Sequence, residues 1–148
     1  MCGILGLCSS EIASFEKFKG SLDKIAHRGA DGHGIWCNEN KNVMLGHRRL
    51  SIIDLSDNAH QPMVLGNRYV LTFNGEIYNY LELKKELEKN DIQCVSETDT
   101  EVIVNTIELN YLIEKDVEKA IEKLVFFRAY LIIFYQIRRV KSFQLYLI

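Results

Sequence analysis

No stretch of this 148-residue chain is long and apolar enough to cross a membrane, since a spanning helix needs ~18 apolar residues in a row. The sequence also lacks a basic leader followed by a long apolar segment, so we expect no secretory signal. Its four cysteines form no CxxC pair, which disfavours a zinc ribbon, and without a secretory signal a disulfide framework is equally unexpected. We therefore expect a cytoplasmic protein with reduced thiols.

A large excess of charge of one sign is also missing. The net charge is −2, so nothing in the balance points to a nucleic-acid partner or an anionic membrane surface. The four histidines include no pair at the spacing of metal ligands on a helix, and we expect no metal ion. A hydrophobic fraction of 47% and a charged fraction of 26% are instead typical of one soluble domain with a sizeable core.

Glycine and acidic residues disappear toward the end of the chain. All nine glycines lie at or before Gly75, and residues 125–148 contain four basic residues but no acidic residue, proline or asparagine. This segment is compatible with two strands, although no typical turn residue separates them. The change in composition divides the chain into residues 1–124 and 125–148.

Short apolar runs predict several strands. We expect strands at 4–7, at 68–75 and at 92–96, and two more within 35–54, on either side of an Asn-rich turn. The glycine-rich segment 28–34 is expected to be a loop, as is 55–62.

Helical periodicity separates these strands. A first helix is expected within 9–29, capped by Ser9 or Ser10, with others over 80–90 and over 98–111, the last capped by Thr98 or Thr100. Because strands and helices mix without a regular βαβ alternation, the pattern favours an α+β fold with mostly antiparallel sheet.

The chain opens on MCGILGL, which puts a cysteine directly behind the initiator methionine. One interpretation is a buried first strand in which Cys2 is a small apolar residue. The other is that Met1 is removed, so that Cys2 carries both a thiol and a free α-amino group and acts as nucleophile and base together. The seven letters alone leave both interpretations open.

A thiolate that attacks a carbonyl creates an oxyanion, which needs preorganised hydrogen-bond donors. Asn74 and Gly75, at the end of a predicted strand, offer a side-chain amide and a backbone N–H. A plain turn is the alternative interpretation of the same pair.

A substrate with an amino-acid backbone needs a cation for its carboxylate and an anion for its ammonium. Arg48 and Arg49 are adjacent, so on a strand they point to opposite faces, and one can bind a carboxylate while the other is solvated. Glu76 and Asp99 are candidates for the ammonium. Their alternatives are a surface carboxylate and a helix cap.

Five blocks of sequence, in this order and at this spacing, resemble a known family: MCGILGL, HRGADGHGIW, LGHRRLSIIDLSDNAHQPM, YVLTFNGEIYNYLELKKEL and SETDTEVI. Over residues 1–124 the chain is similar to the N-terminal glutaminase domain of glutamine-hydrolysing asparagine synthetases, a class II glutamine amidotransferase. The resemblance implies an N-terminal-nucleophile hydrolase fold. This fold is an αββα sandwich of mostly antiparallel sheets, which we expect to be incomplete at its C-terminal end.

The resemblance also implies the chemistry. Cys2, exposed by removal of Met1, would attack the side-chain amide of L-glutamine, and a γ-glutamyl thioester would form as ammonia leaves. Water would then release L-glutamate, and Asn74 and Gly75 would form the oxyanion hole and contact the substrate.

Binding residues follow from the same resemblance. Arg49 would bind the α-carboxylate, the backbone of Ile52 and Ile53 would line the pocket, and Glu76 and Asp99 would hold the α-ammonium. No cofactor is expected in this domain. ATP and magnesium would belong to a synthetase domain, which this chain lacks and which would accept the ammonia as a separate partner.

The resemblance fails at two places. Ala30 stands where the family usually has proline, which changes a loop but removes no chemistry. After residue 124 the family pattern is lost, which leads to the hypothesis that the reading frame shifts near 124–125. Two alternatives to a working glutaminase are therefore an inactive remnant and an amidotransferase domain that serves a different acceptor.

Overall fold

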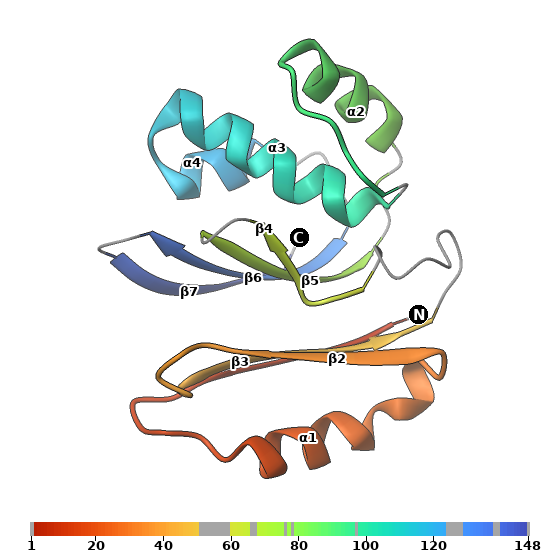
Figure 1. Cartoon of the computed structure of the whole chain (residues 1–148), viewed down its shortest axis with the longest axis vertical. Coiled ribbons are helices and arrows are strands. Elements are labelled where there is room, and N and C mark those ends of the chain that lie inside the picture. The colour runs from red at the N-terminus through yellow and green to blue at the C-terminus, as the bar shows by residue number, and fades with distance from the viewer. Residues whose placement is uncertain are drawn as a thin grey trace.

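The computed structural model describes residues 2–50, 60–65, 68–75, 77, 79–96, 98–123, 129–137 and 140–147, the last two ranges as backbone. These residues form four layers, in the order helix, sheet, sheet, helices (Figure 1). Every strand pairing is antiparallel. The expected αββα sandwich is therefore present.

The first sheet has the strand order β1-β3-β2. Its strands are β1 (Gly3–Cys8), β2 (Gly32–Cys37) and β3 (Val43–Arg49). Helix α1 (Phe15–Lys24) covers its outer face. A Cβ added at Gly46 of β3 would lie 3.0–3.2 Å from side-chain atoms of Phe18 and Leu22, so the absence of a side chain allows α1 to pack closely.

The second sheet has the order β4-β5-β6-β7. It consists of β4 (Met63–Leu65), β5 (Tyr69–Gly75), β6 (Ala129–Ile137) and β7 (Val140–Leu147). Strand β6 pairs with all of β5, from Tyr69 opposite Tyr135 to Gly75 opposite Ala129. Residues 129–137 and 140–147 thus supply two strands of this sheet, while the expected domain division at 124–125 stays a prediction.

Three helices lie on the far side of the second sheet (Figure 1). They are α2 (Tyr80–Lys89), α3 (Asp99–Glu114) and α4 (Val117–Glu122). Helix α3 begins where it does because the Thr98 hydroxyl accepts the N–H of Glu101 at 3.3 Å, so Thr98 is the N-cap and Thr100 is not.

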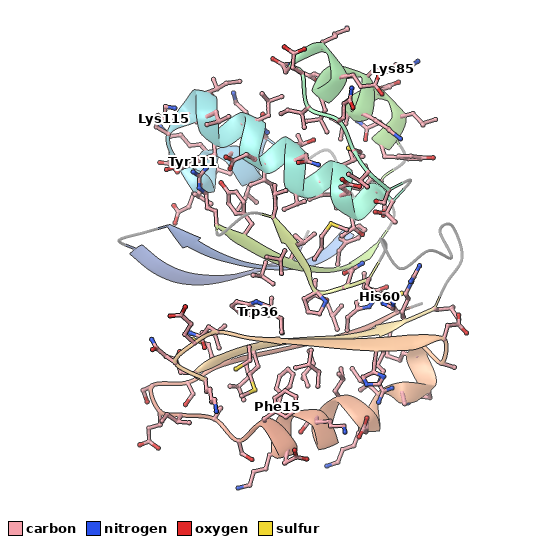
Figure 2. The ribbon with its side chains drawn as sticks, in the orientation of Figure 1. Phe15, Trp36, His60, Lys85, Tyr111 and Lys115 are labelled. Atoms are coloured by element: carbon pink, nitrogen blue, oxygen red, sulfur yellow. The ribbon has the colours of Figure 1, made fainter. Side chains whose placement is uncertain are left out.

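Side-chain alternation on β3 and β5 builds the two cores. Between the sheets, Val43 and Leu45 of β3 pack with Val70 of β5 and with the partly buried Ile4 and Trp36. Figure 2 shows Trp36 in this layer. The opposite face of β5 packs against α3 and α4, in a cluster that contains Tyr69, Leu71, Phe73, Ile103, Val104, Ile107, Val117 and Ile121.

The first helix begins later than expected. Its N-cap is Ser14, whose hydroxyl accepts the N–H of Lys17 at 3.4 Å. The N–H groups of Ser9 and Ala13 instead donate to the carbonyls of Asn42 and Lys41, at 2.8 and 2.7 Å. Residues 9–13 are therefore held against the β2–β3 turn and cannot start a helix, and the expected cap at Ser9 or Ser10 is wrong.

Two other expectations are also corrected. Residues 92–96 form no strand, because the Glu101 carboxylate accepts the N–H groups of Val95 and Ser96, at 2.8 and 2.6 Å. The glycine-rich segment 28–34 is only partly a loop, since β2 begins at Gly32. Strand β4 and helix α4 were not expected, and both are short.

Candidate active site

Cys2 lies just before β1, at the end of the first sheet. The backbone N–H of Leu50 donates to its Sγ at 3.4 Å, and the thiol lies 3.7 Å from the Leu50 carbonyl oxygen. Arg28 Nε donates to the Cys2 carbonyl at 3.2 Å. The thiol is half-buried, and it is held at the end of β3 by the residue that follows Arg49.

The two adjacent arginines of β3 face opposite ways. Arg48 turns to α1, where Nε donates to the Leu22 carbonyl at 3.2 Å and the guanidinium forms an ion pair with Asp23. Arg49 is on the other face and is 9% exposed. A Cβ added at Gly32 would lie 3.9 Å from both Arg49 Cβ and His60 Cε1, so Arg49 sits close to β2 and to the loop that contains His60.

Asn74 and Gly75 are the last two residues of β5, half-buried and exposed respectively. In Figure 1 this end of β5 is at the same end of the sandwich as the N-terminus and the end of β3. Strand β6 pairs with both residues, opposite Tyr130 and Ala129. Asn74 and Gly75 therefore end a paired strand and are not the centre of a hairpin turn.

Asp99 is the first residue of α3. Its carboxylate accepts the backbone N–H of Ile77 at 3.4 Å and the Thr100 hydroxyl at 3.4 Å. Because Thr98 is the N-cap, the interpretation of Asp99 as the cap is wrong. The carboxylate instead faces the segment that follows Gly75. The other predicted binding residues, Ile52, Ile53 and Glu76, lie outside the described residues, as does Met1.

A buried histidine lies beneath these residues in the layer between the sheets. His47, on the same face of β3 as Arg49, is 1% exposed. Burial lowers its pKa to about 4, and the charges of Arg49 and His60 act in the same direction, while the nearby backbone of Phe73 opposes the fall. His47 is therefore neutral at pH 7, and it adds no charge beside Arg49.

Two buried polar side chains near the site, His47 and Thr72, lack hydrogen-bond partners in the part of the chain that the structure describes, which the sequence alone did not indicate. Neither ring nitrogen of His47, nor the hydroxyl of Thr72 on β5, has a hydrogen-bond partner within the described residues. His47 precedes Arg49 by two residues and Thr72 precedes Asn74 by two, so each shares a strand face with a predicted site residue.

Gln61 was expected only as part of a loop, yet it connects two elements of the site. Its side-chain Oε1 accepts the N–H of Phe73 at 2.6 Å, and its Nε2 donates to the Thr100 hydroxyl at 3.1 Å. Finding it required knowledge of which residues lie opposite one another, and no local signal gives that.

For two of the other cysteines, burial outweighs the neighbouring groups that favour a thiolate, which are Lys41 beside Cys37 and Asn105 and Lys84 beside Cys94. Burial raises the pKa of the Cys37 and Cys94 thiols, which favours the unreactive protonated form. Within the described residues no group of three histidine, cysteine or carboxylate side chains could hold a metal ion. Helices long and apolar enough to span a membrane are likewise absent from that part of the chain.

A family model described as a glutamine amidotransferase domain matches residues 1–120. The chain belongs to this family. Amidotransferase relatives include asparagine synthetase [glutamine-hydrolyzing] 1 of Bacillus subtilis, 39% identical over 112 residues, and the asparagine synthetase of Zea mays, 38% identical over 112 residues. An amidase named chry2 of Gibberella zeae is 42% identical over 91 residues.

The amidotransferase domain accounts for only part of these relatives. The matches cover 72%, 73% and 60% of this chain but 17%, 18% and 13% of the three relatives. The chain therefore spans less than a fifth of each of them. The resemblance to the N-terminal domain of asparagine synthetases is nevertheless confirmed.

A solved structure confirms the fold of the amidotransferase domain. Glutamine phosphoribosylpyrophosphate amidotransferase from B. subtilis matches with a TM-score of 0.74, and the match covers 92% of this chain and 35% of that one. At 17% identity, this match establishes the αββα architecture alone.

Proposed function

We propose that this domain hydrolyses L-glutamine to L-glutamate and ammonia, with Cys2 as the nucleophile. The observation that carries the proposal is the position of the Cys2 thiol, held by Leu50 beside Arg49 in a chain of the amidotransferase family. A nucleophile needs a fixed position next to the group that binds its substrate, and this pair supplies both.

The first half of the reaction forms a thioester. With Met1 removed, the α-amine of Cys2 takes the thiol proton, and Sγ attacks the side-chain carbonyl carbon of glutamine. The oxyanion accepts hydrogen bonds from the Asn74 side chain and the Gly75 N–H. The C–N bond then breaks, and the leaving ammonia takes the proton from the α-ammonium.

The second half regenerates the enzyme. A water molecule gives a proton to the α-amine and attacks the thioester carbon, the same donors hold the second oxyanion, and the C–S bond breaks. Sγ takes the proton back, and glutamate leaves. The α-carboxylate of glutamine binds Arg49, the α-ammonium binds Glu76 and Asp99, and the backbone of Ile52 and Ile53 lines the pocket.

The hydrolysis needs no cofactor, and the ammonia serves a synthetase domain or subunit. The acceptor that the relatives favour is the one used for asparagine synthesis, where ATP and magnesium bind to the synthetase part. A domain that serves a different acceptor is the second candidate, since one relative, from Gibberella zeae, is named an amidase and not an asparagine synthetase. We expect glutamate release to be independent of added ATP and magnesium, and a requirement for either would contradict this assignment.

The decisive experiment compares the wild-type chain with Cys2→Ala and Cys8→Ala, recording glutamate release and intact mass on the same samples. We expect loss of Met1 and turnover that falls at least about a thousandfold in Cys2→Ala, because the covalent step is lost. Cys8 is an exposed free cysteine at the end of β1, so Cys8→Ala is expected to retain turnover.

Two results would contradict the proposal in different ways. Undiminished turnover in Cys2→Ala would mean that Cys2 is not the nucleophile. A folded wild-type chain that has lost Met1 but releases no glutamate would favour the inactive remnant.

A further inference from the structure

A single side chain links the strand that carries the proposed oxyanion hole to the helix that carries the proposed ammonium ligand. Gln61 accepts the N–H of Phe73, the residue before Asn74, and donates to Thr100, the residue after Asp99.

The pairing of β4 with β5 explains why Gln61 reaches Phe73. Met63 lies opposite Leu71, so the same antiparallel register, continued by two residues, puts Gln61 opposite Phe73. The backbone carbonyl of Gln61 instead lies against Gly34 of β2, where a Cβ would overlap it. The side-chain oxygen therefore takes the place of a backbone acceptor for Phe73.

On the helix side the bonds continue to the proposed ammonium ligand. The hydroxyl of Thr100, which is 3% exposed, donates to Asp99 Oδ1 at 3.4 Å, and Asp99 Oδ2 accepts the N–H of Ile77 at 3.4 Å. A continuous line of bonds thus runs from Phe73 through Gln61, Thr100 and Asp99 to Ile77. It begins one residue before Asn74 and returns two residues after Gly75.

The opposite end of α3 is fixed to β5 in another way. Arg68, the residue before β5, donates to both carboxylate oxygens of Glu108, at 2.5 and 2.7 Å, and lies 5.0 Å from the centre of the Tyr111 ring. Because this ion pair already holds helix and strand together, Gln61 does not have to hold α3 on the sheet by itself. Its specific effect is on the distance between the C-terminal end of β5 and the N-terminal end of α3.

We propose that Gln61 is a positioning residue, which sets the separation between the oxyanion donors at Asn74–Gly75 and the Asp99 carboxylate. The inference rests on the proposed glutaminase function. Glutamine bound in one conformation has a set distance between its side-chain carbonyl and its α-ammonium, so the enzyme must present the two partner groups at a matching distance. Gln61 touches neither group of the substrate and acts through Phe73 and Thr100. Figure 2 labels His60, the residue before Gln61, and so marks this end of the molecule.

The first test uses Gln61→Met, which keeps the length of the side chain but removes both hydrogen bonds. We expect kcat/KM for glutamine to fall on the order of tenfold or more, with a rise in KM, because the ammonium partner is displaced. Thr100→Val breaks the same line at the helix and is expected to have a similar effect. Thr100→Ser retains the hydroxyl and is expected to stay close to wild type.

A matched control separates positioning from stability. Asn38 also uses a side-chain amide to hold backbone, accepting the N–H groups of Asn42 and Val43 at 3.0 Å each, in the turn between β2 and β3. Asn38→Ala is expected to lower the unfolding temperature while leaving KM unchanged. The double variant with Gln61→Met and Thr100→Val is expected to lose little more than either single variant, because both break one line of bonds.

A second readout does not depend on activity. Hydrogen exchange at the amides of Phe73 and Ile77 is expected to speed up about tenfold or more in Gln61→Met, while the amides of β1 and β3 keep their rates. An unchanged KM in Gln61→Met, or a Thr100→Ser variant as impaired as Thr100→Val, would overturn the positioning role. If the wild-type chain itself releases no glutamate, the proposed function fails. If the wild type is active and Gln61→Met is equally active, this inference alone fails.

Discussion

At the scale of single residues, His47 shows how the site affects stability. The side chain is 1% exposed and faces the space between the sheets, where it lies near Arg49 and His60. A protonated imidazole there would lose its hydration and face like charge. The folded protein therefore keeps His47 neutral over a pH range in which an unfolded chain takes up a proton.

This difference predicts a pH dependence of stability. The pKa of His47 is about 4 in the folded protein and 6.5 in the unfolded chain, so between these values the unfolded state binds more protons. The free energy of unfolding should fall as the pH drops from 6.5 toward 4, by up to about 3 kcal/mol. Urea unfolding across this range measures it.

The matched comparison uses two histidine variants. His47→Leu removes the buried group, and we expect a flatter pH profile. His33 is exposed in the folded protein, so His33→Leu is expected to retain the wild-type slope. Equal slopes in His47→Leu and the wild type would mean that His47 does not cause the dependence.

At the scale of elements, two glycines with different surroundings test how the loop at 60–62 is held. A Cβ at Gly34 of β2 would overlap the Gln61 carbonyl and lie 3.3 Å from Pro62 Cδ. Gly20, on the exposed side of α1, has nothing within 4 Å of its added Cβ. Gly34 therefore permits the close approach of Gln61 to β2, while Gly20 only lowers the stability of α1.

The two substitutions should act in opposite directions. Gly34→Ala is expected to push Gln61 away and to destabilise the fold by about 1–3 kcal/mol, with a rise in KM like that of Gln61→Met. Gly20→Ala is expected to raise stability by about 0.5–1 kcal/mol, because alanine favours a helix interior. Thermal unfolding and glutamate release measure both effects, and a neutral Gly34→Ala would refute the close approach.

At the scale of the whole molecule, the second sheet depends on strands that lie beyond residue 120, where the match to the family model ends. Strand β5 ends in the proposed oxyanion donors and is paired along its length with β6. Its other neighbour, β4, covers only Tyr69–Leu71. Without β6, one edge of β5 would present unpaired N–H and C=O groups.

A chain ended after residue 124 is therefore expected to lose turnover and to associate through the free edge of β5. A chain that ends after Ile137 keeps β6 and lacks β7. In that chain the amides of β5 are expected to exchange more slowly than in the chain that ends after residue 124. Size-exclusion chromatography and hydrogen exchange of Tyr69–Gly75 distinguish the two. A monomeric, active chain of residues 1–124 would show that β6 is dispensable.

The sequence predicted well whatever depends on local chemistry. The C-terminal end of β5 was predicted from Asn74–Gly75, and the start of α3 from a cap at Thr98 or Thr100, because both signals act over a few residues. The structure then selected Thr98 as the cap. The opposite directions of Arg48 and Arg49 followed from the alternation of a strand. The expected strand at 92–96 failed because Glu101 takes the N–H groups that a strand would need.

By itself the sequence determined the family, the class of fold and the short motifs around Cys2, Arg49, Asn74 and Asp99, because blocks of neighbouring residues carry that information. Only the tertiary structure decided that α1 begins after Ser14, that burial lowers the pKa of His47, and that Gln61 connects β5 to α3. Each of these depends on groups far apart in the chain, such as Ala13 with Lys41 and Gln61 with Thr100. Hydrogen bonds and burial act through distance in space, and that distance is set only once the sheets have packed together.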